Sequence, residues 1–136
     1  MLLVGSPPCK AFSILQGLVR PQQDPAKNAA EREEGEKHLH TAVTGYKDQI
    51  GRGKFFLREH PWSADSWKDP QVRALLTRSD VFLVKGPMCR WDMKVGSQDC
   101  KAEFVRKETG WMTNSPVLAR ILKGVCSNAT GEREWH

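Results

Sequence analysis

The apolar residues of this chain fall into short runs and helically spaced faces that follow one another along the sequence. Leu2 to Val4 is an apolar run that stops at Gly-Ser-Pro-Pro, which predicts a buried parallel strand opening into a loop. From about Asn28 to Ile50 the apolar residues recur at helical spacing, which predicts a helix with one apolar face. Residues 54–58 carry an apolar triplet before a polar tip and predict a second strand.

The second half of the chain repeats this order. Asp69-Pro70 supplies an N-cap and a first-turn proline, which predicts a short helix to about Thr77, and Val81 to Val84 predicts a third strand. Phe104 to Thr113 is typical of an extended segment, and Ser115-Pro116 begins a last helix with apolar residues on one side. The alternation of strands and helices predicts a layered α/β fold.

Composition narrows the class of protein. The 136 residues allow one domain, and 39% hydrophobic with 27% charged residues is typical of a globular chain. No apolar run exceeds four residues, far below the roughly 18 that a membrane span needs. The start of the chain lacks the basic region of a signal peptide, so we expect an intracellular, reducing compartment, nuclear or cytoplasmic. The four cysteines form no C-x-x-C pair, and we expect no metal site.

The net charge of +5 is mildly basic and suits a polyanionic partner without demanding one. Six basic residues against three acids lie between positions 85 and 107, namely Lys85, Arg90, Lys94, Lys101, Arg106 and Lys107. This segment could face phosphate, or it could be an ordinary solvated face. Trp62, Trp67 and Trp91 lie in loop-like contexts and could stack on bases or simply pack.

Two residues could carry chemistry at the strand ends. Cys9 follows a stiff Pro-Pro turn, where Lys10 and a helix start would lower the pKa of its thiol; the alternative is a buried structural cysteine. Glu59 ends the second strand and could hold or donate a proton to a heteroaromatic base; the alternative is an ordinary ion pair. If the two strands are parallel, both residues lie at one edge of the sheet.

At these residues the sequence resembles a known family. Leu3-Val4-Gly5-Ser6-Pro7-Pro8-Cys9-x-x-Phe12-Ser13 resembles the Pro-Pro-Cys motif of the cytosine-C5 DNA methyltransferases, and Phe56-Leu57-Arg58-Glu59-His60-Pro61 is similar to their Glu-Asn-Val motif. Two later segments, Pro87 to Met93 and Lys107 to Asn114, are similar to motifs of methyltransferase-like domains in phage genomes and in transposable-element polyproteins of protists.

The resemblance implies a partial Rossmann-like methyltransferase sheet of mostly parallel strands with flanking helices and a C-terminal antiparallel extension. It implies that Cys9 attacks ring carbon 6 of a flipped cytosine in DNA while Glu59 binds the pyrimidine edge. Carbon 5 would then accept a methyl group from S-adenosylmethionine. The residues implied in substrate binding are Ser6, Pro8, Ser13, Arg90, Lys107 and Thr109.

The sequence also departs from the family pattern. The glycine-rich cofactor loop that precedes Pro-Pro-Cys in the family is absent, and the only Gly-x-Gly, Gly51-Arg52-Gly53, precedes a strand instead of following one. Two hypotheses therefore stay open. Residues 1–126 are either a catalytic half-domain that needs a separate cofactor-binding segment, with 127–136 as a tail, or a catalytically inactive module, derived from a mobile element, that binds nucleic acid or protein.

Overall fold

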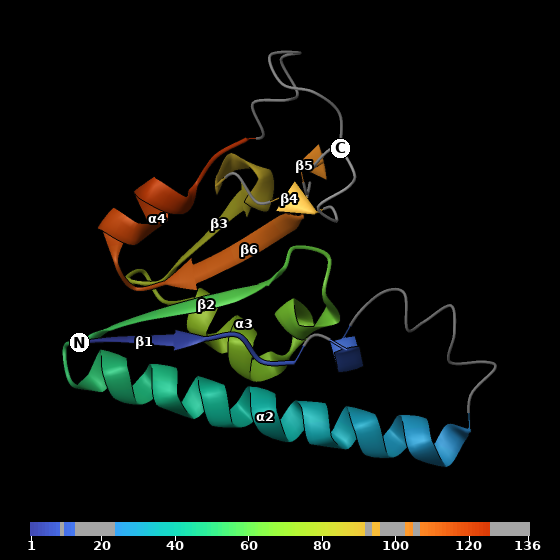
Figure 1. Cartoon of the computed structure of the whole chain (residues 1–136). Coiled ribbons are helices and arrows are strands. Elements are labelled where there is room, and N and C mark those ends of the chain that lie inside the picture. The colour runs from blue at the N-terminus through green and yellow to red at the C-terminus, as the bar shows by residue number, and fades with distance from the viewer. Residues whose placement is uncertain (9, 13–23, 92–93, 96–102, 105–106, 126–136) are drawn as a thin grey trace.

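The computed structural model describes residues 1–8, 10–12, 24–91, 94–95, 103–104 and 107–125. A four-stranded sheet lies between helices, and a separate two-stranded sheet lies beside it (Figure 1). The elements, in chain order, are β1 (Leu2–Gly5), η1 (Lys10–Phe12), α2 (Pro25–Gly51), β2 (Phe55–Pro61), η3 (Asp65–Lys68), α3 (Pro70–Leu76), β3 (Phe82–Pro87), η4 (Met88–Trp91), β4 (Lys94–Val95), β5 (Glu103–Phe104), β6 (Glu108–Thr113) and α4 (Pro116–Leu122).

The main sheet has the strand order β1-β2-β6-β3. β1 and β2 are parallel, whereas β6 is antiparallel to both β2 and β3. The expectation of a mostly parallel sheet with an antiparallel extension is therefore wrong: most of the pairings are antiparallel, and the antiparallel strand lies inside the sheet. The reason is that β6 returns between two strands that share one direction and separates them. The mixed α/β architecture with flanking helices is confirmed.

The long helix α2 begins and ends at residues whose chemistry favours those positions. Asp24 caps it by accepting a hydrogen bond from the Ala26 N–H at 3.0 Å, and Pro25 occupies the first turn. At the other end Gly53 has φ +65°, a left-handed conformation that glycine adopts readily and that turns the chain into β2. The Gly-x-Gly of the sequence thus forms the exit from a helix.

The core lies between the sheet and the layer formed by α2 and α3 (Figure 1). Because side chains alternate along a strand, β2 presents every second residue to these helices. Phe56 stacks on Tyr46 of α2, with ring centroids 4.7 Å apart. The other buried apolar residues of this core are Phe12, Leu39, Val43, Ala64, Val72, Leu75, Val81 and Met112.

The described residues cover the opposite face of the sheet only in part. Helix α4 packs on β3 and β6, while Leu2, Val4 and Phe55 are exposed on the β1–β2 half. Among the described residues no helix is long and apolar enough to cross a bilayer.

Candidate functional site

We call the side of the main sheet where β1, β2 and β3 end and β6 begins the carboxyl edge (Figure 1). Three side chains from distant parts of the sequence meet there. The Ser6 hydroxyl donates to Glu59 Oε2 at 2.7 Å, and the Lys107 ammonium donates to Glu59 Oε1 at 3.1 Å. The shared direction of β1 and β2 brings Ser6 beside Glu59, and the reversed direction of β6 brings Lys107 to the same edge.

The Glu59 carboxylate is the centre of this group. Its side chain is 15% exposed, whereas that of Lys107 is 39% exposed and Ser6 lies on the surface. Both carboxylate oxygens accept a hydrogen bond from the protein itself. A ligand that binds the carboxylate must therefore share it with Ser6 and Lys107 or displace one of them. The carboxylate can accept hydrogen bonds from the donor groups of a heterocycle, and the ammonium group beside it can bind a neighbouring phosphate.

The other residues singled out in the sequence have different positions. Thr109 is buried beside Lys107 and donates to its carbonyl oxygen at 3.3 Å, so its hydroxyl supports the backbone there. Pro8 is exposed and lines a hollow of about 250 Å³ against the first half of α2. Arg90 donates to the carbonyl oxygen of Lys123. Cys9 and Ser13 lie outside the described residues.

A second polar group lies behind Glu59, on the helix-facing side of β2. Arg58 and His60 are fully buried there, and the Arg58 guanidinium stacks 4.2 Å from the ring centroid of Trp67. Its Nη2 donates to Ser66 Oγ at 2.8 Å, while Nε and Nη1 have no hydrogen-bond partner among the described residues. In the same part of the chain, both ring nitrogens of His60 and the Tyr46 hydroxyl are buried without a hydrogen-bond partner.

Burial shifts the proton affinity of this group. It lowers the pKa of Arg58 to about 10, with nearby Tyr46, Asp69 and Glu59 acting in the opposite direction. Burial, reinforced by the Arg58 charge, lowers the pKa of His60 to about 4, so this imidazole is neutral at pH 7. Burial raises the pKa of Tyr46 to about 12. At neutral pH the group therefore consists of one buried cation among neutral polar groups.

Sequence reasoning singled out Glu59 and missed Arg58. Arg58 stands two residues after Phe56, a core residue of the same strand, so strict alternation gave the signal that its side chain faces the core. A charged residue near the end of a predicted strand is normally assigned to the surface, because isolated charges are rarely fully buried.

Two exposed tryptophans with adjacent cations also lie at the carboxyl edge. Trp62 directly follows β2, and the Lys85 ammonium lies 5.5 Å from its ring centroid while pairing with Glu108 at 2.9 Å. Trp91 ends η4, and the Arg90 guanidinium lies 5.5 Å from its ring centroid. By contrast, Trp67 is partly buried, and its indole N–H donates to the Pro61 carbonyl oxygen at 2.8 Å.

Within the described part of the chain no three His, Cys, Asp or Glu side chains group closely enough to hold a metal ion. Comparisons of the chain with protein-family models, with curated proteins and with solved structures found no match.

Proposed function

We propose that this chain is a divergent domain of the cytosine-C5 DNA methyltransferase type, in which the carboxyl edge binds a pyrimidine base. The observation that carries the proposal is the convergence of Ser6, Glu59 and Lys107, all taken from motifs that resemble this family, on one carboxylate. Glu59 would bind the polar edge of the base, and Lys107 would remain close enough to contact the nucleotide. The role of Cys9 as the nucleophile rests on the motif resemblance alone.

The reaction implied for Cys9 can be followed without a cofactor. Addition of the thiolate to carbon 6 of cytosine moves an electron pair to carbon 5, which then takes a deuteron from D₂O. Loss of the original proton from carbon 5, followed by expulsion of the thiolate, restores the base with deuterium in place of hydrogen. No oxidant or methyl donor is consumed, so the isolated chain can be tested.

The test is a mass-spectrometric measurement of deuterium at carbon 5 of a cytosine-containing oligonucleotide incubated with the chain in D₂O. We expect slow exchange that is abolished in Cys9→Ala and reduced at least about tenfold in Glu59→Gln, since a positioned acid or base contributes roughly 100- to 10,000-fold. Cys89→Ala is the matched control, because Cys89 is buried after β3 and should leave the exchange unchanged. Exchange that is absent, or equal in Cys9→Ala, contradicts the proposal.

A second candidate is a catalytically inactive module that binds nucleic acid or protein. It is favoured by the two protein hydrogen bonds that already occupy both oxygens of Glu59. In that case Ser6 and Lys107 stabilise the edge and no base enters. Deuterium exchange separates the two candidates: if the module is inactive, no variant shows exchange, and Glu59→Gln changes only the free energy of unfolding.

A further inference from the structure

Trp62 and Trp91 are large aromatic side chains left on the surface at the carboxyl edge. They are 38% and 47% exposed, respectively. An exposed indole offers a flat face on which a nucleobase can stack, and this contact accepts every base because each has a π-face. Trp67 does not offer such a face, because it is partly buried and the Arg58 guanidinium lies over its ring.

A cation lies over the ring of each exposed indole. The Lys85 ammonium and the Arg90 guanidinium both lie 5.5 Å from the neighbouring ring centroid. Lys85 is 41% exposed and is held in place by Glu108, so its ammonium group keeps donors available to solvent. An aromatic face next to an exposed cation matches the two repeating parts of a nucleic-acid strand, the base and the phosphate.

Trp62 directly follows β2, Trp91 ends η4, which follows β3, and only β6 lies between these two strands. Neighbouring strands lie about 5 Å apart, so the ends of β2 and β3 are separated by about 10 Å. A short nucleic-acid segment spans such a distance. In a duplex the base faces are covered by their neighbours, whereas in a single strand they are available for stacking on side chains.

We propose that the carboxyl edge binds single-stranded nucleic acid, with Trp62 and Trp91 as stacking platforms for unpaired bases and Lys85 and Arg90 as phosphate contacts. This inference goes beyond the proposed base-modifying function and does not require it, because neither Cys9 nor Glu59 takes part. A strand held in this way presents its bases next to Glu59 without prior opening of a duplex.

The test is fluorescence anisotropy with a labelled 12-nucleotide oligocytidine and with a duplex of the same length, at low and moderate salt. We expect the single strand to bind more tightly than the duplex, with affinity that falls as salt rises. Trp62→Leu and Trp91→Leu should each weaken single-strand binding roughly 10-fold, since one base–aromatic stack contributes about 1–3 kcal/mol. Quenching of indole fluorescence on binding should be reduced in both variants.

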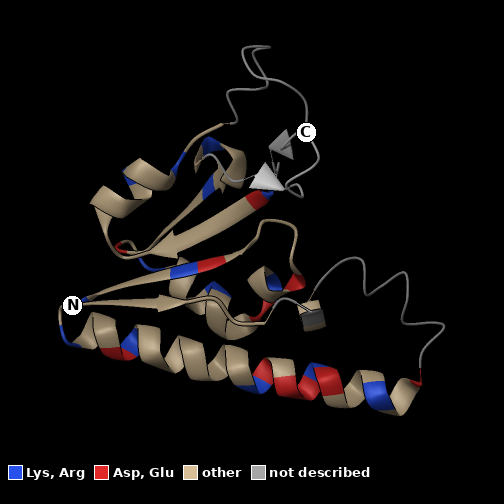
Figure 2. Cartoon of the chain, viewed as in Figure 1, with Lys and Arg blue, Asp and Glu red and all other residues tan. Residues whose placement is uncertain are grey.

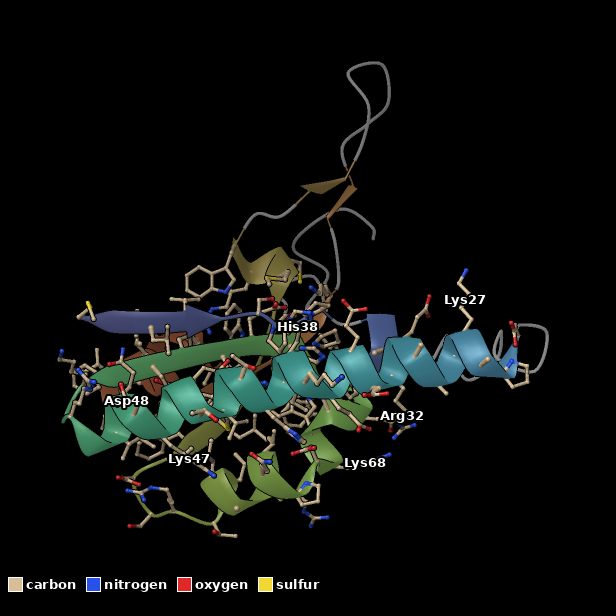
Figure 3. The ribbon with its side chains drawn as sticks, turned by 90° about the horizontal axis from the view of Figure 1, so that it is seen from below. Lys27, Arg32, His38, Lys47, Asp48 and Lys68 are labelled. Atoms are coloured by element: carbon tan, nitrogen blue, oxygen red, sulfur yellow. The ribbon has the colours of Figure 1, made fainter. Side chains whose placement is uncertain are left out.

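Matched controls separate stacking from general charge attraction. Phe55→Leu removes an exposed aromatic ring where β2 begins, at the opposite edge of the sheet, and should leave the affinity unchanged. Lys85→Gln should weaken binding more than Lys47→Gln. Lys47 lies beside α3 near the end of α2, where the chain leads into β2, at the end of the sheet opposite the carboxyl edge (Figure 3). If Trp62→Leu does not fold, Trp91→Leu and Lys85→Gln still decide the question.

Three results would overturn the proposal: duplex binding as tight as single-strand binding, equal losses in the Lys85 and Lys47 variants, or no binding to either probe. Cys9→Ala should bind the oligonucleotide like the unchanged chain. A failure of deuterium exchange with normal single-strand binding therefore contradicts only the proposed catalytic function.

Discussion

His60 combines complete burial with an ionisable ring that has no hydrogen-bond partner among the described residues. Its ring lies edge-on to Phe12 and Trp67, with centroids 6.3 Å from each. Because its folded pKa of about 4 lies below the unfolded value near 6.5, the unfolded chain binds an extra proton between these pH values. Its contribution to stability is fully present above pH 6.5 and is lost as pH falls towards 4.

We predict that proton uptake by His60 in the unfolded chain lowers the free energy of unfolding by about 3 kcal/mol between pH 6.5 and pH 4. His60→Phe keeps a ring between Phe12 and Trp67 and removes the titration, so its stability should vary less over this range. Urea denaturation at several pH values measures the effect. His38→Gln, which removes an exposed imidazole of α2, is the control and should keep the full slope (Figure 3). An unchanged slope in His60→Phe would show that another group controls acid unfolding.

Among the residues that the structure describes, Arg58 is a buried cation with a single side-chain hydrogen bond and a stacking contact. Removing charge from the core relieves desolvation, whereas removing volume leaves a cavity, and the two effects can be separated. Arg58→Met keeps the volume and should leave the free energy of unfolding equal or raise it by about 1–3 kcal/mol. The gain is smaller than it would otherwise be because Ser66 loses the hydrogen bond from Arg58. Arg58→Ala should destabilise the chain. Guanidinium denaturation measures both, and a loss in Arg58→Met as large as in Arg58→Ala would mean that the charge stabilises the fold.

At the scale of elements, the end of β6 is joined to the start of β2 by side chains. Asn114 accepts from the Phe56 N–H and donates to the Lys54 carbonyl oxygen, both at 2.9 Å. Thr113 donates to the Phe56 carbonyl oxygen at 2.6 Å and accepts from the Ser115 N–H at 3.1 Å. Ser115 in turn caps α4. Three successive polar residues thus fix both the strand and the helix that follows it.

Asn114→Ala removes both hydrogen bonds to β2 and leaves a partly buried N–H and carbonyl without these partners. We expect a loss of about 2 kcal/mol, because each net hydrogen bond contributes about 1 kcal/mol. Asn114→Asp keeps the acceptor for the Phe56 N–H but faces the Lys54 carbonyl with a negative charge, so it should be no better than alanine. Thermal unfolding monitored by circular dichroism is the measurement, and Thr44→Ala on the exposed face of α2 is the control. A change within about 0.5 kcal/mol for Asn114→Ala would contradict this role.

The elements themselves could largely be predicted from the sequence. The helical spacing of Leu39, Val43 and Tyr46 places α2, and Ser115-Pro116 places the start of α4, because capping and periodicity are local. The position of β6 could not be predicted, since an extended segment carries no mark of its neighbours. The convergence on Glu59 depends on that position: the motifs name Lys107, but only the reversed strand brings it to the same edge.

At the scale of the whole molecule, charge and exposure are unevenly distributed. The first half of α2 carries the acidic stretch from Glu31 to Glu36, away from the sheet interior (Figure 2). At the carboxyl edge Lys85 and Lys107 are each paired with a carboxylate, and Arg90 donates to the Lys123 carbonyl oxygen. These carboxylates offset part of the positive charge. The attraction of these described residues for polyanions is therefore weaker than the number of basic residues between 85 and 107 indicates.

The chain as given should not bind S-adenosylmethionine with useful affinity. Its single Gly-x-Gly forms the exit of α2 and leads into β2, so its backbone does not form a loop that follows a strand and receives a cofactor. Calorimetric titration should show no heat of binding at micromolar concentrations. A micromolar dissociation constant would contradict this expectation and would point to a cofactor site built in another way.

The position of β6 also sets the order in which the chain can fold. β2 and β3 are synthesised before β6, yet no strand joins them to each other until residues 108–113 insert between them. The contact between Thr113 and Phe56 joins residues 57 positions apart, a long loop to close. A nascent chain that stops before β6 exposes two facing strand edges, which favours aggregation. Closure of the sheet, the Lys107–Glu59 pair and the Asn114 hydrogen bonds all depend on residues 107–114, so none of them can form before this segment is synthesised.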